Sequence, residues 1–424
     1  MAMARIDPGG KLKQIGNQCP WNRGFGSDCI SVFFISTIVT VLFVAQPFLG
    51  LLLIIFLGWL DSPRSYWAPM MLCLLGSAYI GLINTTKVPA SDLLNYLEWF
   101  SRAEGRGLIE YLADFTREPV FYIWTWLISV LTGGDKHAFL FFTSWLCYSV
   151  ITYSIVIVSR HFKIDARLSA LVVLIFLFLP PLFGISAHLL RQFIAASLVA
   201  LFFARRISQQ KSSWWLIAAA VFVHYSALIF VPLALLRVPR RFTPMPYLLF
   251  SAIALCLLYL VVKMSAGLLS QLPLFRVAFL RVAALQIPDV IGLSTNAIIF
   301  LSVILVLVFL NIGTQPRAAV DDKSGYYIEN FNNSVLLLSL VILLSSLSIY
   351  TSEIAMRLFL YLYFMAGPIV LMFLRNRSWV IPLAVPVCML NMIYFFLFVE
   401  FGVWQYSSVM QMLVFPAPLI WGAS

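Results

Sequence analysis

Charged residues are scarce in this sequence: Asp, Glu, Lys and Arg together make up 11% of its 424 residues, whereas hydrophobic residues make up 62%. A soluble domain averages about 25% charged residues, because its surface must face water. So low a fraction excludes an ordinary set of soluble domains and indicates that most of the surface faces lipid. We therefore expect a single integral membrane domain.

Acidic residues are the scarcer charged class, with 17 Asp and Glu against 28 Lys and Arg, which gives a net charge of +11. The basic residues stand in short clusters between apolar runs, as the positive-inside rule requires of cytoplasmic loops. A nucleic-acid-binding protein would instead gather them on one solvated face. The excess of positive charge therefore predicts no nucleic-acid partner.

Several signatures of site chemistry are absent from the sequence. Its six cysteines form no CxxC pair and lie mostly inside apolar runs, which argues against a disulfide framework or a zinc site. It also has no GxxxxGK(S/T) phosphate loop, no HExxH metal motif and no GxSxG nucleophile elbow. We therefore expect no ATP-driven step, no acyl hydrolysis, no cofactor and no metal site.

Hydrophobic runs are abundant, and about 11 to 13 of them are long enough to be membrane segments. We expect an all-α, polytopic transmembrane helix bundle in contact with membrane lipid, with a polar tail at 1–29 and a single transmembrane domain over 30–424. The run Ile30–Leu60 crosses once or twice, and Gln46-Pro47 is the place where it could bend. The expected segments are Ile30–Leu60, Trp67–Ile83, Pro119–Thr132, Ala138–Val158, Leu168–Gly184, His188–Ala204, Trp214–Leu236, Tyr247–Val262, Ala297–Ile312, Val335–Tyr350, Met356–Leu374, Val380–Glu400 and Val403–Trp421.

The basic clusters predict how the bundle is oriented. Cytoplasmic clusters are expected at Arg160/Lys163/Arg167, Arg205/Arg206/Lys211, Arg237/Arg240/Arg241 and Arg375/Arg377. The opposite face then holds Asn84–Arg117, the ends near His188 and Arg191, the loop Lys263–Thr295 and the turn Ser352–Arg357. The run Trp214–Leu236 has basic residues at both ends, so a single crossing there violates the rule. A break near His224 would turn it into a re-entrant pair.

The outer segment Asn84–Arg117 carries two apolar patterns at helical spacing, which predicts short amphipathic helices lying in the membrane interface. Asp92 and Tyr96 are one turn apart and can face the same way. Asp92 either caps a helix or is a functional carboxylate, since Asp favours the capping position. Glu98 and Arg102 are expected to form a solvated pair on the helix surface.

Arg191 lies about one turn inside an apolar run, where an arginine costs roughly 2.5–3.5 kcal/mol to insert. It either extends to the interface or forms an anion site, because a guanidinium binds phosphate oxygens bidentately. His188 is three residues earlier, on the same helix face.

Other polar residues stand at or near membrane depth. His224 is either functional or bonded to the backbone, and Glu353 with Arg357 is either a structural ion pair or part of a site. Arg281, in an outer loop, either meets an acidic group of a ligand or is solvated. Together these carboxylate, arginine, histidine and tyrosine side chains suit an anionic, lipid-linked substrate with a polar head.

The order of these residues resembles the EpsG family of bacterial polysaccharide-polymerising membrane proteins, and Wzy-type polymerases more broadly. The resemblance rests on Asp92-x-x-x-Tyr96 after an early span, Glu118-Pro119-Val120-Phe121 opening the next element, Arg191 followed by Ala195-Ala196, His224-Tyr225-Ser226-Ala227 and a helix with Arg357 near the C-terminus. It covers residues 67–236 and 352–375. In the family a glycine often stands shortly before the Asp and an arginine upstream, where this sequence has Pro89-Ala90-Ser91 and Asn84.

The resemblance implies a GT-C-like glycosyltransferase of the bacterial inner membrane that joins undecaprenyl-pyrophosphate-linked oligosaccharide repeats into an exopolysaccharide, capsule or O-antigen on the periplasmic side. A flippase and a chain-length regulator would be its partners. One alternative is a transporter or flippase of lipid-linked oligosaccharide, and another is a non-catalytic assembly subunit of an envelope complex. We expect metal-independent transfer, with Asp92 or His224 as general base and Arg191 and Arg357 holding pyrophosphate. The expected substrate-binding residues are Tyr96, Glu118, His188, Arg191, Arg281, Glu353 and Arg357.

Overall fold

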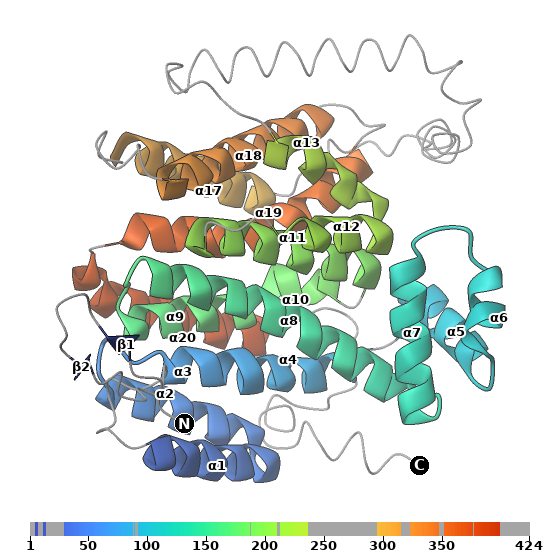
Figure 1. Ribbon diagram of the computed structural model, residues 1–424, viewed down its shortest axis with the longest axis horizontal. Helices are drawn as coiled ribbons and strands as arrows, with labels where there is room; N and C mark the ends of the chain where they lie inside the picture. Colours follow the sequence, from blue (N-terminus) through green and yellow to red (C-terminus); the bar gives the residue numbers. More distant parts are fainter. Residues whose placement is uncertain are drawn as a thin grey trace.

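The computed structural model describes residues 5–6, 12–13, 29–87, 89, 92–186, 188–209, 213–235, 295–314, 323–346, 352–375 and 377–398. Within these ranges the protein is a helix bundle, as expected, apart from a short antiparallel pair, β1 (Arg5–Ile6) with β2 (Leu12–Lys13). The long helices run roughly parallel to one another (Figure 1). Most of the tail at 1–29 and the expected segments Tyr247–Val262 and Val403–Trp421 lie outside the described residues.

The first hydrophobic run is divided where the sequence predicts. α1 (Cys29–Ala45) ends before Gln46, and α2 (Pro47–Leu60) begins with proline at its first position, where the missing N–H is not needed. The two helices pack side by side (Figure 1). Gly50 makes this approach possible, since a Cβ there would lie 2.6 Å from the Cα of Phe43.

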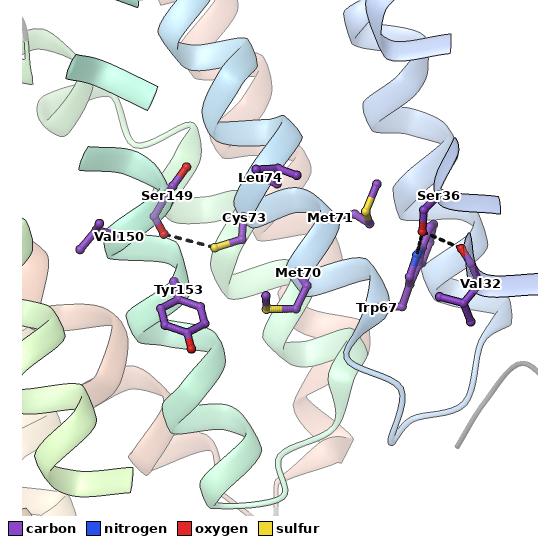
Figure 2. A pocket seen from close by; sticks show the side chains of 10 residues that line it. All are labelled: Val32, Ser36, Trp67, Met70, Met71, Cys73, Leu74, Ser149, Val150 and Tyr153. Atoms are coloured by element: carbon purple, nitrogen blue, oxygen red, sulfur yellow. Dashed lines mark hydrogen bonds between the residues drawn. The ribbon is translucent and has the colours of Figure 1, made fainter. Parts of the chain in front are cut away.

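The next membrane segment contains a defect in its helical hydrogen bonding. α3 (Trp67–Met71), a π-helical turn (Leu72–Gly76) and α4 (Ser77–Asn84) form one continuous stretch. In Figure 2 Cys73 of the π turn points toward Ser149, and Trp67 donates to Ser36 of α1 across 2.9 Å. These residues line an apolar pocket of about 490 Å³. Its lining includes no charged side chain, so it does not match the anion site that the sequence predicts.

Two amphipathic helices follow in the outer segment, as expected: α5 (Asp92–Ala103) and α6 (Leu108–Ala113). Leu93, Leu97 and Phe100 are buried, whereas Leu94 and Ile109 are exposed, Ile109 at 86%. The buried residues of α5 recur at i, i+4 and i+7, and an apolar residue beside such a stripe, like Leu94 or Ile109, faces away from the core. Glu98 and Arg102 form the expected exposed pair at 2.5 Å.

α7 (Pro119–Thr132) has the bounds that the sequence predicts, because Pro119 opens it and Gly133 closes it in a left-handed conformation. It runs across the direction of α8 (Lys136–His161) at one end of the bundle (Figure 1). That orientation agrees with the short length of its apolar run.

The expected segment Leu168–Gly184 is not one helix. α9 (Ala166–Leu177) stops before two consecutive prolines, and α10 (Pro180–Ser186) starts afresh at the first of them. Proline cannot donate the helical hydrogen bond and disfavours helix at the residue before it, so the pair at 180–181 divides the run. α11 (Leu190–Gln209) follows, after the turn that contains His188.

The run Trp214–Leu236 breaks at His224, as its two basic flanks require. α12 (Trp214–Val223) ends there, the backbone of His224 is extended, and a 3₁₀ turn (Tyr225–Ile229) leads into α13 (Phe230–Leu235). Both ends of this segment return to Arg206, whose guanidinium lies 5.8 Å from the Trp214 ring and donates to the carbonyl of Ala234 at 2.6 Å. The segment is therefore a helical hairpin, which is the shape that the expected re-entrant pair requires.

The C-terminal part contributes α17 (Thr295–Thr314), α18 (Lys323–Ser346), α19 (Ser352–Leu374) and, after a 3₁₀ turn (Ser378–Val380), α20 (Ile381–Phe398). α18 begins twelve residues before Val335, where the expected segment starts, because the polar stretch from Lys323 up to Val335 is also helical. Asn330, Asn332 and Ser334 are buried in this stretch, and Asn330 and Ser334 donate to the carbonyl of Leu233. Helical hydrogen bonds and buried partners thus outweigh its low hydrophobicity.

In the part of the chain that the structure describes, four stretches are long and apolar enough to cross a membrane: Trp67–Asn84, Lys136–His161, Arg357–Leu374 and Ser378–Phe396. The protein is therefore a multi-pass membrane protein. Its basic loops meet at one end, where Arg375 lies 5.1 Å from the ring of Phe162 and Arg160 lies 5.9 Å from that of Tyr66. The helices α5, α6 and α7 gather at the other end (Figure 1).

This arrangement predicts the accessibility of single cysteines placed in a cysteine-free background. We expect an impermeant thiol reagent to label positions 92, 191 and 357 in intact cells, and positions 205 and 375 only after membrane rupture, because the basic loops stay in the cytoplasm. Labelling of position 92 only after rupture would contradict the assigned orientation.

Candidate functional site

Glu118 stands immediately before α7 in a backbone conformation that non-glycine residues rarely adopt, with φ 57° and ψ 49°. Such a conformation costs on the order of 1–3 kcal/mol and persists only where the surroundings enforce it. Here Pro119 fixes the start of α7, and the Glu118 carboxylate is buried, with only 8% of its side chain exposed. Strained backbone of this kind occurs often at functional sites, so we take Glu118 as the starting point of the site.

Arg191, in the first turn of α11, forms an ion pair with Glu118. Its Nη1 donates to Oε2 of Glu118, and 22% of the arginine side chain remains exposed. The guanidinium also lies over two aromatic rings of α5, 5.0 Å from the centroid of Trp99 and 5.6 Å from that of Tyr96. A carboxylate and two π faces thus compensate the intramembrane charge that the sequence left unexplained.

The aromatic rings under Arg191 are held by a larger cluster. Trp99 meets Tyr122 of α7 edge-on at 5.8 Å, and Phe115 stacks on Tyr122 at 3.6 Å. The hydroxyl of Tyr111 donates to the carbonyl of Trp99 at 3.0 Å. These contacts join α5, α6 and α7 into one aromatic cluster beside Arg191.

The break at His224 brings the helical hairpin to the same place. The backbone N–H of Tyr225 donates to Oε1 of Glu118 at 3.4 Å, and Nδ1 of His224 lies 4.0 Å from the same oxygen. That separation is too long for a hydrogen bond. The hairpin backbone therefore holds Oε1 of Glu118, while Arg191 holds Oε2.

His224 is fixed by Ser226 and Tyr361. Its Nδ1 accepts from the backbone N–H of Ser226 at 3.1 Å and lies 2.8 Å from the Ser226 hydroxyl, which in turn lies 2.7 Å from the hydroxyl of Tyr361. A ring nitrogen that accepts a backbone N–H carries no proton, so the neutral imidazole holds its proton on Nε2. Tyr361 donating to Ser226, and Ser226 donating to Nδ1, satisfies all three groups.

α19 joins the site through a side chain next to Arg191. The Gln192 amide donates to the backbone carbonyl of Arg357, so the beginning of α11 is tied to the first turns of α19. Burial raises the pKa of the Tyr96 hydroxyl, an effect that the charges of Arg191 and Arg357 oppose and that of Asp92 reinforces. The charges of Asp92, Arg191 and Arg357 therefore all act on one tyrosine.

A buried lysine supports this end of the bundle. Lys87, 3% exposed in the turn after α4, donates to the carbonyl of Phe183 and lies 3.4 Å from the Ser186 hydroxyl. Asn84 donates to the same hydroxyl at 3.1 Å. These contacts fasten α10 to α4, directly before the turn that leads to His188 and Arg191.

The structure thus brings together most of the residues expected from the sequence: Tyr96, Glu118, Arg191 and His224 directly, and Asp92 and Arg357 around Tyr96. His188 is in the turn before α11. Glu353 is in α19, although its side chain is not among those described, and Arg281 lies outside the described residues.

Four residues at the site were given no role by the sequence analysis: Trp99, Gln192, Ser226 and Tyr361. Signals were present for two of them. Gln192 is a second polar residue beside Arg191 in an apolar run, and Ser226 follows the intramembrane histidine by two positions. Nothing in the sequence distinguishes Trp99 or Tyr361 from their aromatic neighbours.

The sequence model of the EpsG family matches residues 66–408, which include every site residue named above. The chain belongs to the EpsG family. The EpsG family is linked to exopolysaccharide biosynthesis, and membership links this multi-pass protein to that process. No curated protein and no solved structure gives a significant match.

Proposed function

We propose that this EpsG-family protein is a glycosyltransferase that polymerises undecaprenyl-pyrophosphate-linked oligosaccharide repeats on the periplasmic side of a bacterial inner membrane. The observation that carries the proposal is the Arg191–Glu118 pair, which is partly buried at the end of the bundle away from the basic loops. A fixed guanidinium that water reaches only in part is suited to a phosphate group at the membrane surface.

The proposed reaction is a single glycosyl transfer. A hydroxyl oxygen of the acceptor repeat attacks the anomeric carbon of the donor, and the bond from that carbon to the pyrophosphate oxygen breaks. The electron pair leaves with the pyrophosphate, and the hydroxyl proton goes to a protein base. Arg191, with Arg357 nearby, stabilises the charge that develops on the leaving group.

The tautomer of His224 and the aromatic cluster beside Arg191 support two further roles in this proposal. His224 holds its proton on Nε2, because Ser226 occupies Nδ1, so the histidine orients a partner as a donor. Tyr96 and Trp99 present apolar faces with polar edges, as sugar rings require. A flippase exporting the repeats and a chain-length regulator are the expected partners in the membrane.

Deletion of the gene tests this function against export of the same lipid-linked repeats. Loss of a polymerase leaves single lipid-linked repeats on the outer face of the inner membrane, because export continues without elongation. Accumulation of the repeats on the cytoplasmic face would overturn the proposal and favour a flippase. The measurement compares labelling of the lipid-linked repeat by an impermeant reagent in intact cells with its labelling in ruptured cells.

We expect polymerisation by the purified protein to persist in EDTA. Guanidinium groups neutralise phosphate charge without a metal, and two arginines act near Tyr96. Within the described residues no three His, Cys, Asp or Glu side chains form a group suited to a metal. The prediction is tested by comparing polymer length with and without the chelator. Activity that disappears in EDTA and returns with Mg²⁺ would contradict it.

A further inference from the structure

Arg191 is expected to hold the pyrophosphate of a substrate, yet in this structure its guanidinium already holds a carboxylate. Nη1 of Arg191 donates to Oε2 of Glu118, and the pair is largely withdrawn from water. A phosphate can accept two parallel hydrogen bonds from this planar fork, whereas Glu118 accepts one. Substrate and Glu118 therefore compete for one cation.

We propose that the pyrophosphate of the donor displaces Glu118 from Arg191, and that the released carboxylate is the general base that takes the proton of the acceptor hydroxyl. The inference rests on the proposed function and names the base of that reaction. It gives Glu118 the role for which the sequence favoured Asp92.

The position of Glu118 supports this role better than that of either alternative. Asp92 is the first residue of α5 and is half-buried at the rim, whereas Glu118 contacts both Arg191 and the hairpin backbone beside His224. His224 accepts at Nδ1 and carries its proton on Nε2, so in its neutral form it has no basic nitrogen to offer.

The exchange couples donor binding to the chemistry. While Arg191 holds the carboxylate, Oε2 accepts from Nη1 of the guanidinium, so the acceptor hydroxyl can donate to that oxygen only after the pyrophosphate has taken its place. Oε1 stays near the N–H of Tyr225, so the group remains in place when Oε2 is released. The left-handed backbone at Glu118 is a further constraint on where the carboxylate can move.

The step balances without any additional reactant. The acceptor O–H bond breaks and its proton forms a new bond to the Glu118 carboxylate, while the acceptor oxygen bonds the anomeric carbon. The bond between that carbon and the pyrophosphate breaks, and the pyrophosphate keeps the electron pair beside Arg191. Release of the pyrophosphate lets Glu118 lose its proton to water and return to Arg191.

The test measures binding and transfer separately on the full-length protein in nanodiscs. Glu118→Gln removes the competing charge, so undecaprenyl pyrophosphate should bind at least about 5-fold more tightly. The same variant lacks the base, so transfer from a lipid-linked repeat should fall at least about 100-fold. Glu98→Gln, an exposed carboxylate of α5 paired with Arg102, is the matched control and should change neither quantity.

The opposite changes overturn the inference. If Glu118 only holds Arg191 in position, Glu118→Gln weakens the binding of undecaprenyl pyrophosphate. Transfer by Glu118→Gln at the wild-type rate, or a larger loss in Asp92→Asn than in Glu118→Gln, would assign the base elsewhere. A wild-type protein that binds undecaprenyl pyrophosphate but transfers no repeat contradicts the proposed function itself, which separates the two failures.

A second variant keeps the test decisive if Glu118→Gln does not fold. Glu118→Asp keeps the charge but shortens the side chain by one methylene group, which weakens its hold on Arg191. We expect tighter binding of undecaprenyl pyrophosphate and a transfer rate between those of wild type and a variant without a base. Weaker binding in Glu118→Asp would exclude competition for Arg191.

Discussion

Arg191→Lys should lower polymerisation by about 100-fold or more, although the substitution keeps the positive charge. A lysine ammonium is a point charge without the planar fork that meets two phosphate oxygens at once. It would also lose the position over the rings of Trp99 and Tyr96, where the guanidinium lies 5.0 and 5.6 Å from the ring centroids. Removing one fixed donor to a developing oxyanion costs about 10²–10³ in rate.

The measurement is the rate of polymer formation from lipid-linked repeats, with protein amount normalised in the membrane fraction. Arg102→Lys is the matched control, because that arginine belongs to an exposed pair on α5 and should tolerate the exchange. Polymer formation by Arg191→Lys at the wild-type rate would show that charge alone suffices at this position.

Lys87→Glu is expected to prevent the protein from accumulating in the membrane. Lys87 is fully enclosed, with its ammonium donating to the Phe183 carbonyl and lying 3.9 Å from the centroid of the Phe183 ring. A carboxylate at this position would face the carbonyl oxygen and the negative face of the ring of Phe183, and the hydrogen-bond donor that Lys87 supplies would be lost. An uncompensated buried charge costs about 3–5 kcal/mol, a large share of the stability of a domain.

Membrane yield and the thermal transition of the detergent-solubilised protein measure this effect. Lys136→Glu is the control, since Lys136 is an exposed residue at the beginning of α8. Lys87→Met removes the charge but keeps most of the volume, so it should fold with a lower transition temperature than wild type. A Lys87→Glu protein as stable as the control would mean that α10 does not depend on this contact.

Local sequence chemistry was sufficient for the helices and their interruptions in much of the chain. The proline at 119 and glycine at 133 set the bounds of α7, and the basic residues on both sides of Trp214–Leu236 required the break at His224. The prediction of one undivided run over Leu168–Gly184 was wrong, because the prolines at 180 and 181 interrupt helical hydrogen bonding whatever the hydrophobicity of the run. In each of these cases the start, end or break of a helix is determined by residues close to it in the sequence.

The site depended on contacts between residues distant in the sequence, and these could be predicted only in part. Order along the chain and family resemblance brought Glu118, Arg191 and His224 into one candidate set. Their pairing could not be inferred, because Glu118 and Arg191 are 73 residues apart and meet only when the beginning of α7 lies beside the first turn of α11. The bond from Gln192 to the backbone of Arg357 spans 165 residues and involves a carbonyl, which no side-chain pattern reveals.

The hairpin at His224 affects how the membrane crossings of this chain are counted. Because Trp214 and Ala234 both lie at Arg206, the two ends of the segment are at the same end of the bundle, which predicts that the segment adds no crossing. A hydropathy profile that scores Trp214–Leu236 as one span changes the parity of the count. Every later loop, including the basic turn at Arg375 and Arg377, is then assigned to the wrong compartment, and reporter fusions placed after it would seem to conflict with those placed before it.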